Sequence, residues 1–78
     1  MPRTAKEVMD EIDDRIAKVA DGKSVMPVAS ELWRWFNDLD ALLRQTPPSD
    51  TRTHLFHHMT YVATWLQQAG ETVIFPGE

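Results

Sequence analysis

Residues 27–45 read PVASELWRWFNDLDALLRQ, and large apolar side chains recur in this stretch every three or four positions. Such spacing places them on one face of a helix. Pro27 suits the first turn of a helix, where a missing N–H group costs no hydrogen bond. The sequence therefore predicts a helix over 27–45. Its apolar face consists of Val28, Leu32, Trp35, Phe36, Leu39, Leu42 and Leu43.

The preceding segment predicts a second amphipathic helix, over 5–21. Thr4 and Glu7 have the spacing of a capping box, in which each side chain satisfies a backbone N–H near the helix start. Gly22 can adopt the left-handed conformation that ends a helix. The apolar positions of this helix are Ala5, Val8, Met9, Ile12, Ile16, Val19 and Ala20.

The following segment predicts a third helix, over 51–69, after a break at Pro47 and Pro48. Ser49 or Asp50 can cap its start, and Gly70 can end it. Residues 71–78 form a short tail that is β-branched and aromatic, so we expect it to be extended. The main apolar stripe of this third helix is Leu55, Met59, Val62, Leu66 and Ala69.

The chain has 78 residues, which is the size of one domain. Three helices joined by short loops favour an antiparallel up-down-up arrangement. We therefore predict a single all-α domain over 1–78, a compact three-helix bundle with an extended C-terminal tail that could lie along it.

Charge is absent from one long stretch. Residues 53–70 read THLFHHMTYVATWLQQAG and contain no Asp, Glu, Lys or Arg. A helix on the surface of a small protein normally carries charge on its outer face. We therefore expect more than one side of this third helix to be covered, and a short chain has little mass of its own to cover it. The third helix is the best candidate for a partner interface.

A stripe beside the main apolar stripe supplies candidate contact residues. His54, His58, Tyr61 and Trp65 follow one another at helical spacing, and each combines an apolar body with a polar edge. Tyr and Trp are enriched among the residues that dominate binding energy at interfaces. The alternative is that this flank packs against the first helix or the tail. Trp33, at the edge of the second helix, and Phe75, in the tail, complete the predicted partner-binding set.

Motifs for catalysis are missing from the sequence. There is no Cys, so disulfides and thiolate metal sites are excluded, and the three Gly form no phosphate-binding loop. We predict neither an enzyme nor a resident cofactor. His54 and His58 share a helix face and could supply half of a zinc site. A small metal- or ligand-binding bundle, completed across a symmetric dimer, therefore remains an alternative.

The formal net charge of −4 argues against direct nucleic-acid binding, which needs a basic surface, and against adhesion to anionic membranes. The acidic run over 10–14 leaves open an alternative, a surface that mimics nucleic acid or meets a basic partner. The N-terminus has no apolar signal region, and no apolar run approaches the roughly 20 residues of a membrane span. We expect a cytoplasmic protein.

These observations favour a small accessory protein that works by binding. We predict a non-catalytic protein–protein interaction module, such as an adaptor, inhibitor or regulatory subunit, that binds through its third helix and tail. A domain this small often relies on oligomerisation for stability. Because closed two-fold assemblies are the commonest, the predicted partner is another protein or a second copy in a homodimer.

Overall fold

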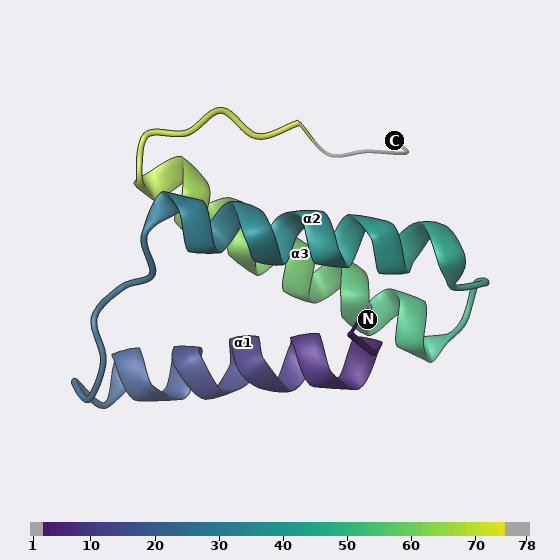
Figure 1. Cartoon of the computed structure of the whole chain (residues 1–78), viewed down its shortest axis with the longest axis horizontal. Helices are drawn as coiled ribbons and strands as arrows, with labels where there is room; N and C mark the ends of the chain where they lie inside the picture. The colour runs from purple at the N-terminus through teal and green to yellow at the C-terminus, as the bar shows by residue number, and fades with distance from the viewer. Residues whose placement is uncertain (1–2, 75–78) are drawn as a thin grey trace.

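The computed structural model describes residues 3–74 and confirms the all-α three-helix fold. The helices are α1 (Ala5–Ala20), α2 (Ala29–Gln45) and α3 (Asp50–Gln68). Figure 1 shows α2 running back alongside α1, and α3 crossing obliquely behind α2. After α3 the chain turns and returns beside α2, as expected for the tail (Figure 1).

The predicted start and stop signals of α1 are confirmed. The Thr4 hydroxyl accepts from the Glu7 backbone N–H at 3.2 Å, and the Glu7 carboxylate accepts from the Thr4 N–H at 3.1 Å. Gly22 has a φ of +74°, and the Lys23 N–H beyond it donates to the Lys18 carbonyl at 2.8 Å. This closing geometry favours glycine, because a side chain strains the backbone at such a φ.

The ends of α3 follow the same rules. Ser49 is the N-cap, and its hydroxyl accepts from the Arg52 N–H at 3.3 Å. Gly70 has a φ of +88°, and the Glu71 N–H reaches the Leu66 carbonyl at 3.0 Å. The break at Pro47 and Pro48 and the stop at Gly70 thus lie where the sequence predicts them.

The start of α2 differs from the prediction. The helix begins at Ala29, because Val28 has extended dihedral angles (φ −76°, ψ 161°) and serves as the N-cap without a side-chain cap bond. Pro27 therefore precedes the cap instead of lying in the first turn. Val28 is 65% exposed, so its assignment to the apolar face was wrong. Val28 fits the apolar spacing of the helix, but this spacing does not bury its side chain, because the helix begins only at the next residue.

The core lies mainly between α2 and α3, which pack together far more extensively than either packs on α1. From α1 only Val8 and Ile12 are fully buried, whereas Ala5, Met9 and Ile16 are half-buried against the core. The other buried side chains come from α2 and α3: Leu32, Trp35, Phe36, Leu39, Leu43, Leu55, Met59, Val62, Ala63, Trp65 and Leu66.

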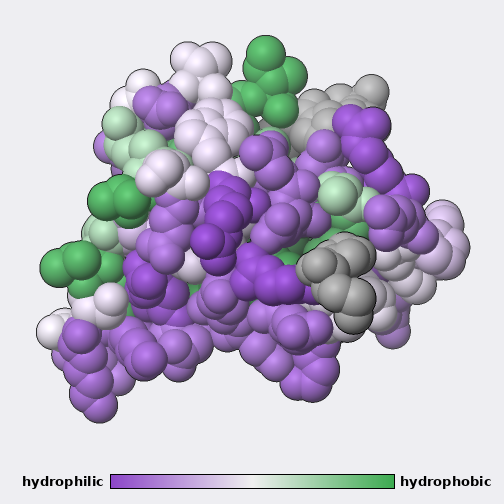
Figure 2. All heavy atoms as spheres, in the orientation of Figure 1, coloured by the Kyte–Doolittle hydropathy of each residue, from purple (hydrophilic) through white to green (hydrophobic). Residues whose placement is uncertain are grey.

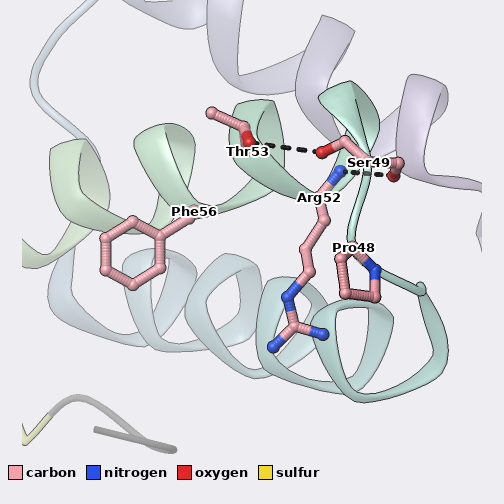
Figure 3. A pocket seen from close by; sticks show the side chains of 5 residues that line it. All are labelled: Pro48, Ser49, Arg52, Thr53 and Phe56. Atoms are coloured by element: carbon pink, nitrogen blue, oxygen red, sulfur yellow. Dashed lines mark hydrogen bonds between the residues drawn. The ribbon is translucent and has the colours of Figure 1, made fainter.

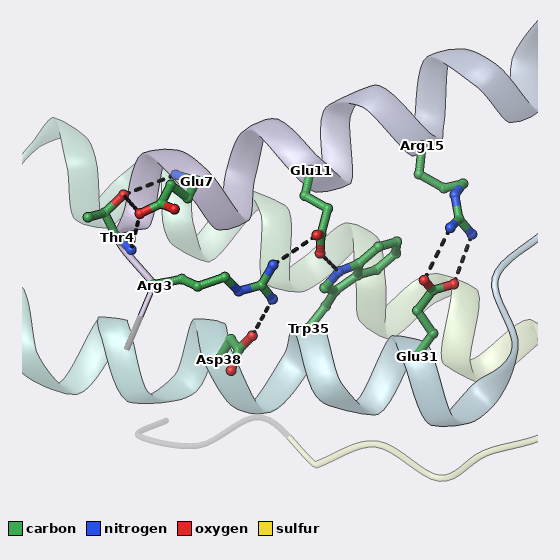
Figure 4. A network of polar contacts seen from close by, with 8 residues as sticks. All are labelled: Arg3, Thr4, Glu7, Glu11, Arg15, Glu31, Trp35 and Asp38. Carbon is green, nitrogen blue, oxygen red and sulfur yellow. Dashed lines mark hydrogen bonds and ion pairs between the residues drawn. The ribbon is translucent and has the colours of Figure 1, made fainter. Parts of the chain in front are cut away.

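Polar contacts supplement this thinner packing of α1 (Figure 4). The Arg3 guanidinium lies 2.9 Å from a Glu11 oxygen and 2.6 Å from an Asp38 oxygen, and the Trp35 indole N–H also donates to Glu11. Burial of the Glu11 carboxylate disfavours its charged form, but the hydrogen bonds from Arg3 and Trp35 outweigh this effect and lower its pKa. The network joins the start of α1 to the middle of α2.

A second ion pair joins the other end of α1 to α2. The two terminal nitrogens of Arg15 donate to the two carboxylate oxygens of Glu31, at 2.8 and 3.1 Å (Figure 4). The same guanidinium lies 5.7 Å from the centre of the Trp35 ring, within the range of a cation–π contact. Bidentate geometry fixes the relative position of the helices as well as attracting them.

Candidate interaction surface on the third helix

The side of α3 that points away from the bundle is exposed and uncharged. Leu55, Met59, Val62 and Leu66 are fully buried, and the residues on the opposite side of the helix are all exposed. We call these exposed residues the outer face of α3. The outer face comprises Thr53, Phe56, His57, Thr60, Thr64, Gln67 and Gln68. The fold thus buries one side of the uncharged helix, and the residues of the outer face remain at least partly exposed, Phe56 to 40%.

The other two helices expose a different kind of surface. Their outer sides carry charged pairs one helical turn apart, as is usual for solvated helices. These pairs are Lys6–Asp10, Asp14–Lys18 and Asp40–Arg44. Figure 2, which looks onto the side of α1 and α2, is accordingly mostly hydrophilic. Its apolar patches lie at the loop before α2 and along the tail, where Val25, Val28 and Ile74 are exposed.

Hydrogen bonds within the helix make the outer face less polar than its composition suggests. The hydroxyls of Thr53, Thr60 and Thr64 donate to the carbonyls four residues earlier, at 3.2, 3.0 and 3.0 Å. A Thr hydroxyl bonded in this way has already used its single donor. What these threonines offer a partner is a small methyl-bearing surface and a weak acceptor.

A hollow of about 340 Å³ lies at the N-terminal end of the outer face (Figure 3). Pro48 and Phe56 supply its apolar walls, and Ser49, Arg52 and Thr53 supply its polar ones. The Arg52 guanidinium is held in place because its Nη1 donates to the carbonyls of Leu43 and Thr46, at 3.1 and 2.9 Å. The hollow therefore suits a side chain that has both an apolar stem and a polar end.

The predicted stripe of His54, His58, Tyr61 and Trp65 turns toward α1 and not directly outward. The His58 side chain is 18% exposed, and its Nε2 lies 2.8 Å from an oxygen of Asp13 on α1. Trp65 is 7% exposed and belongs to the core. His58 therefore packs against the first helix, as in the alternative interpretation of this flank, and Trp65 packs inside the core.

Tyr61 and His54 remain accessible at the edge of this stripe. Tyr61 is 43% exposed, and its ring meets Trp65 edge to face with the ring centres 5.1 Å apart. His54 is exposed, and its carbonyl lies 2.8 Å from the Nδ1 of His58. Both residues border the outer face, so they can take part in a contact centred on it.

Trp33 and the tail contact each other. The half-buried Trp33 ring meets Phe36 edge to face at 5.5 Å, and its indole N–H donates to Glu71 at 2.8 Å. Val73 packs partly against the core. Trp33 thus covers a core edge and holds the tail, and only part of its surface is open to a partner. Phe75, also predicted to bind a partner, lies outside the described residues.

A metal site receives no support from the geometry within one chain. Among residues 3–74, no group of three or more His, Asp or Glu side chains lies close enough together to hold a metal ion. His58 is engaged with Asp13, and His54 and His57 are exposed. A metal-binding bundle would therefore need ligands from another molecule.

Comparisons with known protein families, with characterised proteins and with solved structures find no significant match. The function must therefore be argued from the residues themselves. None of the three helices is both long and apolar enough to cross a membrane, as far as residues 3–74 are concerned. The cytoplasmic location expected from the sequence stays a prediction.

The predicted contact residues on α3 do not include several of the residues that the structure leaves exposed on this helix. Phe56, His57, Thr60, Thr64 and Gln67 were not among the predicted contact residues. The signal that identifies them is their position outside the main apolar stripe: His57 and Thr64 lie nearly opposite it, and Phe56, Thr60 and Gln67 lie on the flank away from the predicted stripe. The predicted stripe lies only a quarter-turn or so from the core side, where the placement of α1 decides whether a residue is buried.

Proposed function

We propose that this protein is a non-catalytic protein–protein interaction module that binds through the outer face of α3. The tail and the bordering Tyr61 and His54 would extend the contact, and an adaptor, inhibitor or regulatory subunit would use such a surface. The homodimer expected from the sequence belongs to this proposal and is developed in the next subsection.

The observation that carries the proposal is the absence of charge from an exposed helix face. Interface centres are depleted in charged residues and enriched in aromatic ones. The outer face has no Asp, Glu, Lys or Arg, and Phe56 within it and Tyr61 beside it are 40% and 43% exposed. Helix faces that contact only solvent usually carry charged residues, as the exposed sides of α1 and α2 do.

The acidic run on α1 supports nucleic-acid mimicry less well than the outer face of α3 supports binding to a protein. Each of its carboxylates already pairs with a side chain of the same protein. The pairs are Asp10 with Lys6, Glu11 with Arg3, Asp13 with His58 and Asp14 with Lys18. A mimic of nucleic acid would present its negative charges to a basic partner. The outer face of α3 presents none, so we favour an uncharged protein surface as the partner.

Photo-cross-linking in living cells tests the proposal. A photoreactive amino acid at Thr64 places the probe within the outer face, and the same probe at Ala17 places it on the exposed side of α1. A third probe, at Val25, examines the exposed apolar loop before α2. All three positions are solvent-exposed, so the fold tolerates each replacement.

We expect an adduct of defined mass from position 64 and none from position 17. Its mass tells whether the partner is a second copy or another protein, and either result supports the proposed function. If adducts form only at position 25, or equally at all three positions, the outer face is not the contact surface and the proposal fails.

A further inference from the structure

We propose that the partner of the outer face of α3 is the same face of a second copy, packed antiparallel about a two-fold axis at Thr60. This inference rests on the function proposed above, because it names the occupant of that surface. It also specifies which residues of the two copies meet.

The charge of the chain favours a second copy over a basic partner. In a two-fold assembly a surface meets itself, so each charge near the axis faces a like charge. The chain is acidic, with a net charge of −4, so an uncharged patch at the axis lets two copies meet without placing like charges together. A surface for a basic partner would instead carry acidic side chains, and the outer face of α3 carries none.

The charges at the two ends of α3 favour the antiparallel orientation. Asp50 and Arg52 lie at the start of the helix, and Glu71 lies just beyond its end. Parallel packing would bring each of these residues next to its own counterpart. Antiparallel packing brings Glu71 of one copy toward the start of α3 in the other, where Arg52 and the positive end of the helix dipole favour an anion.

The sizes of the side chains fix the position of the axis. Thr60 lies near the middle of the outer face, with Phe56 one turn before it and Thr64 one turn after it. A two-fold axis at Thr60 places the small Thr60 side chains at the crossing point. It also sets each Phe56 ring against Thr64 of the other copy, a large side chain against a small one, as close packing requires.

The hollow at Phe56 gives this register a second, independent feature. With the axis at Thr60, Gln67 and Gln68 of one copy approach Thr53 and Arg52 of the other. These two residues line the hollow of about 340 Å³. A Gln side chain has an apolar stem for the Pro48 and Phe56 walls, and an amide that can bond the polar side of the hollow.

Single-cysteine variants test the inference on the purified protein, because the natural chain has no Cys. The series is Thr53→Cys, Thr60→Cys, Thr64→Cys and the control Ala17→Cys, each oxidised under the same mild conditions. A disulfide needs Cα atoms closer than about 7 Å. Two copies of residue 64 are displaced by about 12 Å along antiparallel helices, at 1.5 Å per residue, so only position 60 meets its own counterpart.

We expect Thr60→Cys to form the covalent dimer at least about tenfold faster than Ala17→Cys, since association raises the local thiol concentration. Thr53→Cys and Thr64→Cys should react like the control. A mixture of isotope-labelled Phe56→Cys with Thr64→Cys should yield the mixed dimer in preference to either homodimer.

Two results would overturn the inference. Equal rates at positions 53, 60 and 64 would indicate parallel packing, and a rate at position 60 no higher than at position 17 would exclude this pairing. Neither result rejects the proposed function if the cellular adduct at position 64 has the mass of a different protein. The absence of any such adduct would reject the proposed function itself.

Discussion

His58 of α3 and Asp13 of α1 are joined by a hydrogen bond of 2.8 Å between the imidazole Nε2 and a carboxylate oxygen. The other ring nitrogen of His58 lies 2.8 Å from the carbonyl oxygen of His54. The ring of His58 is therefore held on one side by α1 and on the other by its own helix. This contact ties one flank of α3 to α1, and leaves the outer face as the part of the helix open to a partner.

We expect a modest coupling between these two residues. Asp13→Asn and His58→Gln each remove one partner, and the double variant completes the cycle. The Asp13 side chain is 61% exposed, so solvent screening limits the coupling to about 0.2–1 kcal/mol. Urea unfolding of the four proteins at pH 6 measures it, and strictly additive losses would show that the pair does not fix α3 against α1.

Leu39→Ala should strongly destabilise the protein. Leu39 is fully buried in the middle of α2, and truncating such a residue typically costs about 2–5 kcal/mol. Val28→Ala is the matched control, because Val28 is exposed at the helix start and its loss should cost no more than about 0.5 kcal/mol. Comparable losses from the two substitutions in denaturant unfolding would contradict the described core.

Much of this fold could be predicted from the sequence, because its signals are local. Thr4 with Glu7, Ser49, and the glycines at 22 and 70 mark helix ends through backbone chemistry that involves only neighbouring residues. The register of Leu32, Leu39, Leu55 and Leu66 follows from helical periodicity alone.

The parts that failed depend on contacts distant in sequence. Trp65 is buried in the core and His58 is bonded to Asp13 of α1, and periodicity within α3 cannot show which flank of this helix the other helices cover. The bonds of Arg3 to Glu11 and Asp38 likewise have no sequence signature, since charged residues at such separations are common. Val28 was misassigned because periodicity does not show where a helix begins.

Acid should weaken the attachment of α1. The pKa of Glu11 is lowered by Arg3 and Trp35 against the opposing effect of burial, and the pKa of Glu7 is lowered by hydrogen bonds from the Thr4 backbone and hydroxyl. A lowered carboxyl pKa stabilises the fold above the unfolded value of about 4.3, and this contribution is lost as the pH falls through the folded value.

We therefore expect the free energy of unfolding to fall as the pH drops through and below the unfolded value of about 4.3. Glu11→Gln should be less stable than the parent at pH 7 and should lose less on acidification. Denaturant unfolding at several pH values measures both effects. A variant with the same pH dependence as the parent would show that Glu11 does not contribute to it.

Loss of the Glu71 carboxylate should loosen the tail. In Glu71→Ala the Trp33 indole N–H loses its acceptor, and a net hydrogen bond of this kind is worth about 0.5–1.5 kcal/mol. Glu71→Gln keeps a side-chain acceptor and serves as the control. Tryptophan emission should shift toward that of a solvated indole in Glu71→Ala only. An unchanged spectrum would show that this contact does not hold Trp33.

The mass of the protein in solution tests the central claim most directly, when measured by sedimentation equilibrium on three proteins. Thr60→Arg places a charge at the centre of the outer face of α3, and Ala17→Arg places the same charge on the exposed side of α1. We predict that the natural chain and Ala17→Arg have twice the mass of one chain and that Thr60→Arg has the mass of one. A natural chain that is monomeric at high concentration, or a Thr60→Arg variant that remains dimeric, would contradict the pairing of two copies through this face.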